Sequence, residues 1–251
     1  MRHILLIGIG PGHPDQITLQ AIDAIHRADV FFIPGKGEEK IELAAIRHAM
    51  LDRHLPGGRH RVVPFDVPVR DAAAPYRDGV HAWHDEIGEA YERLFTEHLS
   101  DGQTGAFLVW GDPSLYDSTI RILDAVKARG SVDVTSEIIP GITSVQQLTA
   151  AHRIPLNAIG EAVEITTGRR LSEQYPEDSD SVVVMLDGRT AFAGLDRDDL
   201  DIFWGAYLGT PDEILISGRL SEVADEILRT RAEARERKGW MFDTYLLRKR
   251  S

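Results

Sequence analysis

A buried strand that stops at a glycine and proline turn constrains the fold of this chain more than any other feature. Residues 105–118, GAFLVWGDPSLYDS, begin with an apolar run typical of a strand covered on both faces. Gly111 lets the backbone turn, and Pro113 keeps Asp112 out of the helical region, so Asp112 is expected to cap the next helix. That helix is expected to run to about Arg129, with Gly130 just beyond its end. Because ligands bind where parallel strands end and helices begin, the sequence predicts a binding site at this turn.

A second turn of this kind follows the apolar strand at residues 3–9. The turn, GIGPGHPDQ at residues 8–16, begins like a dinucleotide-binding fingerprint. His13 occupies the position of the third glycine, and Pro11 lacks the N–H that a diphosphate would need. Ordinary dinucleotide binding is therefore disfavoured. Asp15 is expected to cap the helix that follows.

A third turn, PGITS at residues 140–144, follows a strand predicted at residues 132–138. Thr143 or Ser144 is expected to cap the helix after it. Strand, turn, helix and strand in this order predict a doubly wound parallel sheet. Beyond it, short apolar runs and one polar helix predict a second α/β domain. The expected domains are therefore residues 1–138 and residues 139–251.

Composition narrows the possible partners and surroundings. The 251 residues include 28 basic and 40 acidic side chains, a net charge of −12, which argues against nonspecific binding to nucleic acid or to an anionic membrane. No apolar run approaches the ~20 residues of a membrane span, and Met1 leads directly into a strand. The absence of cysteine excludes disulfides and thiolate metal sites, and the histidines show no metal-binding pattern. A cytoplasmic protein without a metal is expected.

A predicted helix over residues 41–55 ends in a locally basic segment. This reversal of charge suggests an anion site, because arginine binds carboxylates through two hydrogen bonds. Cations that favourably interact with the helix dipole are an equally good explanation. The basic residues are Arg47, His48, Arg53, His54, Arg59, His60 and Arg61.

Taken together, these segments resemble the tetrapyrrole (corrin/porphyrin) methylase family. The resemblance lies in IGIGPGHPDQITLQA, WGDPSLYDS and EIIPGITSVQQLTAAHRIPL, in this order and spacing. Further along, VVVMLDGRTAF and GWMFDTYLLRK resemble the members that methylate precorrin-5 in cobalamin synthesis. The resemblance covers nearly the whole chain. It implies the class III methyltransferase fold, which has two α/β domains with S-adenosylmethionine in the cleft between them, and a homodimer.

The resemblance also implies which residues contact the methyl donor. Glycine and proline turns suit this role because they let the main chain approach a ligand closely. The donor-binding residues expected by similarity are Pro11, Gly111, Asp112, Leu115, Thr143, Ser144, Met185, Leu186, Tyr207 and Leu208.

The reaction implied is methyl transfer to C1 of precorrin-5 with release of acetate. Loss of the acetyl group by attack of water needs a base and donors to the oxyanion. Asp117 and Tyr116 are the candidate catalytic residues, although a structural role on the helix surface is the more usual one for such residues. Substrate carboxylates would need cations, and the candidates are Arg53, Arg59, Arg61, Arg121, Arg169 and Arg170.

Two other hypotheses remain open from the sequence. One is a family methyltransferase with another substrate, which could be a different precorrin, a protein or ribosomal RNA. The other is a non-catalytic module that binds a nucleotide or a tetrapyrrole. Binding of S-adenosylmethionine and S-adenosylhomocysteine would separate a methyltransferase from a tetrapyrrole carrier.

Overall fold

The computed structural model describes residues 1–35, 38–57, 60–70 and 76–250. The chain forms two compact units, Met1–Ile142 and Thr143–Ser251. The sequence places the boundary at residue 138, which lies inside strand β5 (Val134–Ile139). Because β5 pairs along its length with the first sheet, the division falls after the turn that follows this strand.

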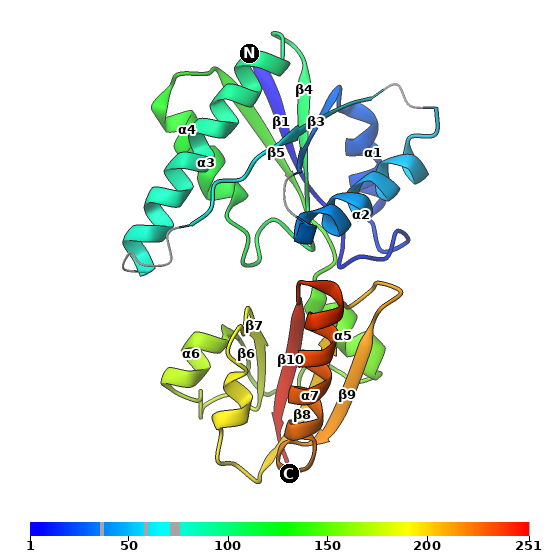
Figure 1. The fold of residues 1–251 in the computed structure, drawn as a ribbon, viewed down its shortest axis with the longest axis vertical. Helices are drawn as coiled ribbons and strands as arrows, with labels where there is room; N and C mark the ends of the chain where they lie inside the picture. The colour runs from blue at the N-terminus through cyan, green and yellow to red at the C-terminus, as the bar shows by residue number, and fades with distance from the viewer. Residues whose placement is uncertain (36–37, 58–59, 71–75, 251) are drawn as a thin grey trace. The chain divides into compact units, whose positions relative to one another are not determined.

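The first unit is a doubly wound parallel sheet with strand order β3-β2-β4-β1-β5 (Figure 1). The other strands are β1 (Arg2–Gly8), β2 (Val30–Pro34), β3 (Arg61–Phe65) and β4 (Thr104–Val109). Helices α1 (Leu19–Arg27) and α2 (Glu38–His54) pack on one face, and α3 (Tyr76–His98) and α4 (Thr119–Arg129) pack on the other. This arrangement confirms the predicted fold class of this region.

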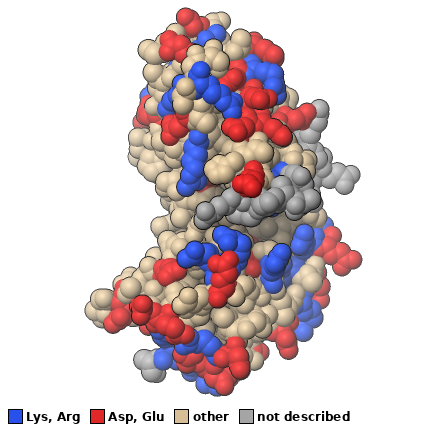
Figure 2. Space-filling view, turned by 90° about the vertical axis from the view of Figure 1, so that its left-hand side faces the viewer, with Lys and Arg blue, Asp and Glu red and all other residues tan. Residues whose placement is uncertain are grey.

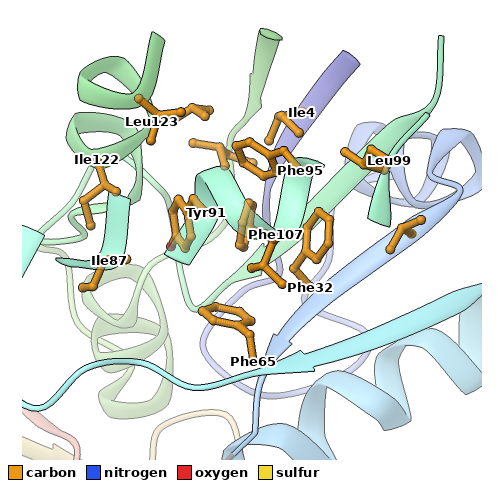
Figure 3. Packing of buried hydrophobic residues seen from close by; sticks show 14 of the residues in the cluster. Ile4, Phe32, Phe65, Ile87, Tyr91, Phe95, Leu99, Phe107, Ile122 and Leu123 are labelled. Atoms are coloured by element: carbon orange, nitrogen blue, oxygen red, sulfur yellow. The ribbon is translucent and has the colours of Figure 1, made fainter. Parts of the chain in front are cut away.

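Aromatic side chains fill the core between the sheet and α3 (Figure 3). The rings of Tyr91 and Phe107 lie 4.5 Å apart, and those of Phe32 and Phe107 lie 5.3 Å apart. Such ring pairs stabilise a core beyond the area that they bury. The aromatic residues of α3 therefore serve packing, as their helical spacing predicts.

The second unit contains a mixed sheet with strand order β6-β7-β10-β8-β9. Its strands are β6 (Val163–Thr167), β7 (Ser181–Met185), β8 (Leu200–Ala206), β9 (Ile214–Arg219) and β10 (Asp243–Lys249). Only β6 and β7 pair in parallel, whereas β10 and β9 pair antiparallel with their neighbours. Its helices are α5 (Ser144–His152), α6 (Gly168–Glu173), α7 (Leu220–Lys238) and the short 3-10 helix η1 (Ala191–Gly194).

The observed helix N-caps agree with one of the predicted caps and differ from two others. Of the two residues expected to cap α5, Thr143 is the one that does so, and it also forms a capping box with Gln146. The predictions for Asp15 and Asp112 are wrong: Thr18 caps α1, and α4 begins only after Ser118. Asp112 cannot cap α4 because residues 113–118 form a non-helical turn.

No helix in the described part of the chain is both long enough and apolar enough to span a bilayer.

Candidate functional site

In the first unit, the turns that follow β1 and β4 are joined by their main chains. The Ile9 N–H donates to the Val109 carbonyl at 2.9 Å, and the Gly111 N–H donates to the Gly10 carbonyl, also at 2.9 Å. The return bond from Gly10 to the Gly111 carbonyl measures 3.3 Å. These two turns therefore form one rigid main-chain edge at the carboxyl ends of the central strands.

The turn after β5 completes this edge through Gly141. Its N–H donates to Oδ2 of Asp112 at 2.8 Å. A Cβ atom at Gly141 would lie 2.1 Å from the Gly111 carbonyl oxygen and 2.9 Å from the Cα of Gly8. Only glycine allows so close an approach. The bends around residues 11, 111 and 141 therefore meet at one edge, as the sequence predicts.

Asp112 holds two of the three turns together as an ionised carboxylate. Oδ1 accepts the Ser114 N–H at 2.8 Å and also the Ser114 hydroxyl, while Oδ2 accepts from Gly141. Partial burial opposes ionisation, but these hydrogen bonds outweigh it and keep the pKa of Asp112 below its ordinary value. The residue therefore links two loops where the sequence predicted a helix cap.

The chemistry of this edge fits a ligand without phosphate. Pro11, Pro113 and Pro140 bring no N–H donors to it, and Asp112 adds a negative charge that would repel a diphosphate. S-adenosylmethionine has no phosphate and carries a positive sulfonium, so its chemistry fits the groups present here.

The remaining candidates of the second turn have distinct surroundings. Leu115 is half-buried, and its N–H closes a turn onto the Asp112 carbonyl at 3.2 Å. Tyr116 has a left-handed backbone, with φ of 52°, and its side chain is 41% exposed. Oδ1 of Asp117 accepts the Thr119 N–H at 2.7 Å, so this carboxylate stabilises the start of α4. Tyr116 is thus the more accessible of the two catalytic candidates.

Arg47 on α2 is a half-buried cation that supports the end of β4. Its guanidinium donates to the Leu108 carbonyl at 2.9 Å and to the Leu43 carbonyl at 3.0 Å. Burial lowers the pKa of Arg47 to about 10, and nearby Asp117 and Tyr91 oppose this shift. The sequence grouped Arg47 with anion-binding residues, but its guanidinium is used inside the protein.

The structure does not gather the first unit's substrate-binding candidates into one cationic group. Arg53 forms an ion pair with Asp15, and Arg121 donates to the Asp117 carbonyl at 3.3 Å. Arg61 is the first residue of β3 and donates to the His98 carbonyl. It therefore lies at the amino edge of the parallel sheet, opposite the turns, which argues against a role at the site. Arg59 lies outside the described residues.

In the second unit, several donor-binding candidates have side chains that are hydrogen-bonded or buried within the protein. Ser144 shares a hydrogen bond of 3.0 Å with the hydroxyl of Thr244. Tyr207 is buried and donates its hydroxyl to the Trp240 carbonyl at 2.8 Å, and Leu208 is buried beside it. Tyr207 nevertheless has a left-handed backbone, with φ of 49°. Tyr207 and Leu208 would therefore contact a ligand mainly through their backbone groups.

The turn after β7, in contrast, exposes a large apolar side chain to solvent. Met185 ends the strand half-buried, and Leu186 follows with φ of 54° and a side chain that is 64% exposed. A large apolar side chain held outward on a strained backbone is a typical ligand contact. Leu186 is therefore the best exposed of the donor-binding candidates in this unit.

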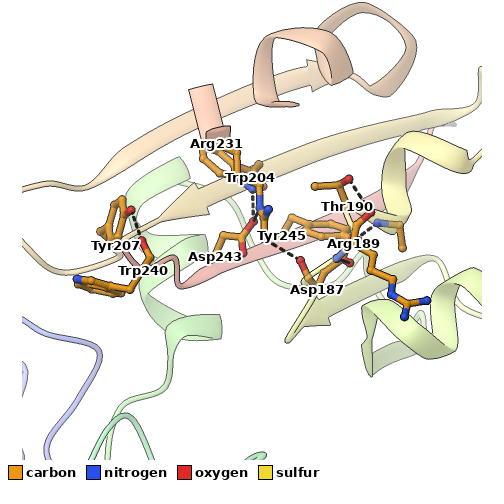
Figure 4. Close-up of polar contacts among 10 residues, drawn as sticks. Asp187, Arg189, Thr190, Trp204, Tyr207, Arg231, Trp240, Asp243 and Tyr245 are labelled. Atoms are coloured by element: carbon orange, nitrogen blue, oxygen red, sulfur yellow. Dashed lines mark hydrogen bonds and ion pairs between the residues drawn. The ribbon is translucent and has the colours of Figure 1, made fainter. Parts of the chain in front are cut away.

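A buried carboxylate, Asp187, holds this turn in place (Figure 4). Oδ2 accepts the Tyr245 hydroxyl at 2.6 Å and the Ala191 N–H at 2.7 Å, and Oδ1 accepts the Arg189 N–H at 3.1 Å. Burial, together with the Asp187 charge, raises the pKa of Tyr245, so the phenol stays protonated and donates. Arg231 adds a bond to the Asp187 carbonyl at 2.9 Å.

Sequence reasoning missed this network, although an Asp-Gly pair after a buried strand was visible. That pair predicts a turn, but its distant partners Arg231 and Tyr245 have no local signal. Within the described residues, no three acidic or histidine side chains come together as a metal ion would require.

Comparisons with known proteins show which family and which folds this chain resembles. Residues 3–224 match the family described as Tetrapyrrole (Corrin/Porphyrin) Methylases. The chain is 56% identical over 250 residues to a Precorrin-6A synthase [deacetylating] from a Sinorhizobium species, covering 99% of this chain and 96% of that protein.

Two solved structures have the same fold. A putative cobalamin synthesis related protein, CobF, from Corynebacterium diphtheriae aligns over 100% of both chains at 39% identity, with a TM-score of 0.85. A uroporphyrin-III C-methyltransferase from Thermus thermophilus, crystallised with S-adenosylhomocysteine, aligns over 98% of this chain and 96% of that one at 19% identity, with a TM-score of 0.61.

Proposed function

This chain belongs to the tetrapyrrole (corrin/porphyrin) methylase family, and we propose that it is an S-adenosylmethionine-dependent C-methyltransferase of cobalamin biosynthesis. Its substrate is precorrin-5, which it methylates at C1 with release of acetate to give precorrin-6A. The observation that carries this proposal is the near-full-length identity of 56% to a precorrin-6A synthase. The main-chain edge around Gly10, Gly111 and Gly141, whose chemistry suits a ligand without phosphate, supports it independently.

The donor is held largely by main chain in this proposal. Pro11, Gly111, Asp112 and Leu115 supply the first unit's contacts, with Asp112 also providing a negative charge for the sulfonium. Thr143, Ser144, Met185 and Leu186 supply those of the second unit, together with the backbone at Tyr207 and Leu208. When bound, the donor supplies an electrophilic methyl group.

The protein's main contribution to methyl transfer is alignment. With the donor bound, the electron pair of the ring carbon would form the new carbon–carbon bond while the methyl–sulfur bond breaks and its electron pair stays on sulfur as a neutral thioether. No strong new charge would therefore have to be stabilised by the protein. Rigid turns that hold the reacting carbons about 3–3.5 Å apart can supply roughly 7–11 kcal/mol. The hydrogen bonds between Gly10 and Gly111 provide such rigidity.

The acetyl group leaves in a separate hydrolytic step. Water adds to the acetyl carbonyl, the bond between the acetyl carbon and the macrocycle breaks, and the electron pair and a proton remain with the macrocycle as acetate departs. We assign Tyr116 to donate to the developing oxyanion because its side chain is exposed on the second turn. Asp117, which accepts the Thr119 N–H, orients the same turn.

The proposal is tested by incubating the purified protein with precorrin-5 and methyl-labelled donor. Label should appear on the macrocycle together with one acetate for each methyl transferred, detected by mass spectrometry and NMR. Methylation without acetate would leave the methyltransferase assignment standing and refute the deacetylating one. Tyr116→Phe should slow acetate release by roughly 100-fold if it stabilises the oxyanion, while leaving binding of S-adenosylhomocysteine unchanged.

A homodimer in the cytoplasm completes the proposal. The dimer is what the family resemblance implies, and the location is the one expected for an enzyme of this biosynthetic pathway. Light scattering coupled to size exclusion would give twice the chain mass of 27.9 kDa for a dimer. Cell fractionation would test the location.

A further inference from the structure

Arg170 and Arg189 are among the arginines of the second unit for which the described residues supply no acidic partner. Arg170 lies in α6 and Arg189 in the turn after β7, and both are exposed. Their neighbours differ: Arg169 pairs with Glu173 at 3.0 Å, and Arg197 pairs with Asp199 at 2.7 Å. In a chain with 40 acidic and 28 basic side chains, two unpaired guanidinium groups are available for an external anion.

The sheet brings these arginines to the same edge. Strands β6 and β7 are parallel neighbours, and their last residues, Thr167 and Met185, pair with each other. The segments that carry Arg170 and Arg189 therefore leave the sheet together. Gly168 packs directly on Asp187, since a Cβ at Gly168 would lie 2.2 Å from Oδ1 of Asp187. Figure 2 shows basic side chains on the side of this unit that carries α6, with acidic side chains among them.

The backbone that carries Arg189 is fixed before any ligand binds. Asp187 accepts the Arg189 N–H at 3.1 Å and the Tyr245 hydroxyl at 2.6 Å. Leu186 and Thr190, on either side of this segment, both have φ of 54°. The Arg189 side chain extends away from the Asp187 carboxylate (Figure 4). Because the backbone of Arg189 is already ordered, the residue loses less conformational entropy when it binds a ligand.

We propose that Arg170 and Arg189 form a carboxylate subsite that binds peripheral carboxylate side chains of the tetrapyrrole substrate. This inference rests on the proposed function, because Leu186, from the same turn as Arg189, is a proposed donor contact. The subsite would then lie beside the point of methyl transfer. Guanidinium groups suit this role because each can bind a carboxylate through two parallel hydrogen bonds.

The same chemistry could be presented by the amino-acid carboxylate of the methyl donor. The proposal assigns the subsite to the macrocycle, so the experiment measures the two ligands separately. Uroporphyrin, a stable fluorescent tetrapyrrole polycarboxylate, serves as the macrocycle probe, with S-adenosylhomocysteine present at saturation. S-adenosylhomocysteine alone is measured by calorimetry.

The variants are Arg170→Gln, Arg189→Gln, the double variant and Arg189→Lys. Arg229→Gln is the matched control, since Arg229 is exposed on α7 of the same unit. Each single glutamine variant should weaken uroporphyrin binding by about 10-fold and the double variant by about 100-fold. Arg189→Lys should lose less than Arg189→Gln because it keeps the charge but not the paired donors. The control, and the affinity of every variant for S-adenosylhomocysteine, should stay within about twofold.

Three results would overturn the inference. The first is a double variant that binds uroporphyrin within about twofold of the unmodified protein. The second is an equal loss in Arg229→Gln, which would indicate a general effect of charge. The third is weaker binding of S-adenosylhomocysteine, which would assign the subsite to the donor. Failure of the proposed function is a separate result, in which the unmodified protein binds both ligands but transfers no label to precorrin-5.

Discussion

The two units hold their candidate ligand turns rigid in different ways. In the first unit, main chain bonds to main chain, and the turns approach so closely that Gly141 has no room for a Cβ. In the second unit, the turn after β7 keeps non-glycine residues Leu186 and Thr190 in left-handed conformations. There the buried carboxylate of Asp187 fixes the backbone.

This difference determines what each turn can tolerate. Turns built from main-chain contact should be sensitive to added atoms, because backbone cannot move aside as a flexible side chain can. A turn held by a buried polar network should be sensitive to atoms removed, because each lost acceptor leaves buried donors unsatisfied. Five predictions test this contrast, from the largest expected effect to the smallest.

The largest effect is expected from Gly141→Ala. Its Cβ would lie 2.1 Å from the Gly111 carbonyl oxygen, so the three turns could not keep their contacts. Calorimetry should show S-adenosylhomocysteine affinity reduced by at least about 100-fold, with stability lower by about 1–3 kcal/mol. Gly188→Ala is the control, since its Cβ would meet nothing within 4 Å. If Gly141→Ala bound S-adenosylhomocysteine within tenfold of the unmodified protein, close main-chain contact at Gly141 would not be what shapes the site.

Asp187→Ala should be the most damaging change in the second unit's turn. It leaves the donors of Arg189, Ala191 and Tyr245 without their acceptor. Urea unfolding should show a loss of about 3 kcal/mol or more. Tyr245→Phe removes one donor and leaves the carboxylate, so about 1 kcal/mol is expected. Equal losses in the two variants would show that the carboxylate does not organise the turn.

An intermediate effect is expected from Asp112→Asn. The carboxylate uses one oxygen for Ser114 and the other for Gly141, whereas asparagine offers a single acceptor oxygen. Affinity for S-adenosylhomocysteine should fall by about 10-fold at neutral pH. Unchanged affinity would mean that the link between Asp112 and Gly141 does not shape the site.

The pH dependence of Asp112 follows from its lowered pKa. Because the folded-state pKa lies below the ordinary value of 3.8, the ionised carboxylate stabilises the fold fully above that value. This contribution is lost as the pH falls through the lower, folded-state pKa. Carbon-13 NMR of the labelled carboxyl should therefore find its midpoint below 3.8, and a midpoint at or above that value would contradict the hydrogen bonds described here.

The smallest effect is expected from Leu186→Ala. The side chain is 64% exposed, so stability should change by less than about 0.5 kcal/mol. If the donor covers this side chain, its loss removes about 1 kcal/mol of apolar contact and weakens S-adenosylhomocysteine binding by roughly fivefold. A change in stability without a change in affinity would place Leu186 in the fold instead of the site.

Predictions from the sequence succeeded where the signal was local. Thr143 caps α5 because its partner Gln146 lies within the same helical turn. Gly130 ends α4 in a left-handed conformation for the same kind of reason. Asp112 failed as a predicted cap because residues 113–118 form a non-helical turn, and its carboxylate accepts instead from Gly141 in the turn after β5. The sequence contains both residues but does not show that they meet.

By itself, the sequence determined the strands, the glycine and proline turns after them, and the family to which they belong. Buried apolar runs and turn residues act over a few positions, so their effect can be read locally. Only the tertiary structure decided that Arg47 donates to the Leu108 carbonyl of β4, that Arg61 lies at the opposite edge of the sheet, and that Asp187 accepts from Tyr245. These contacts join residues far apart in the chain, and only the packing of the sheets brings their side chains together.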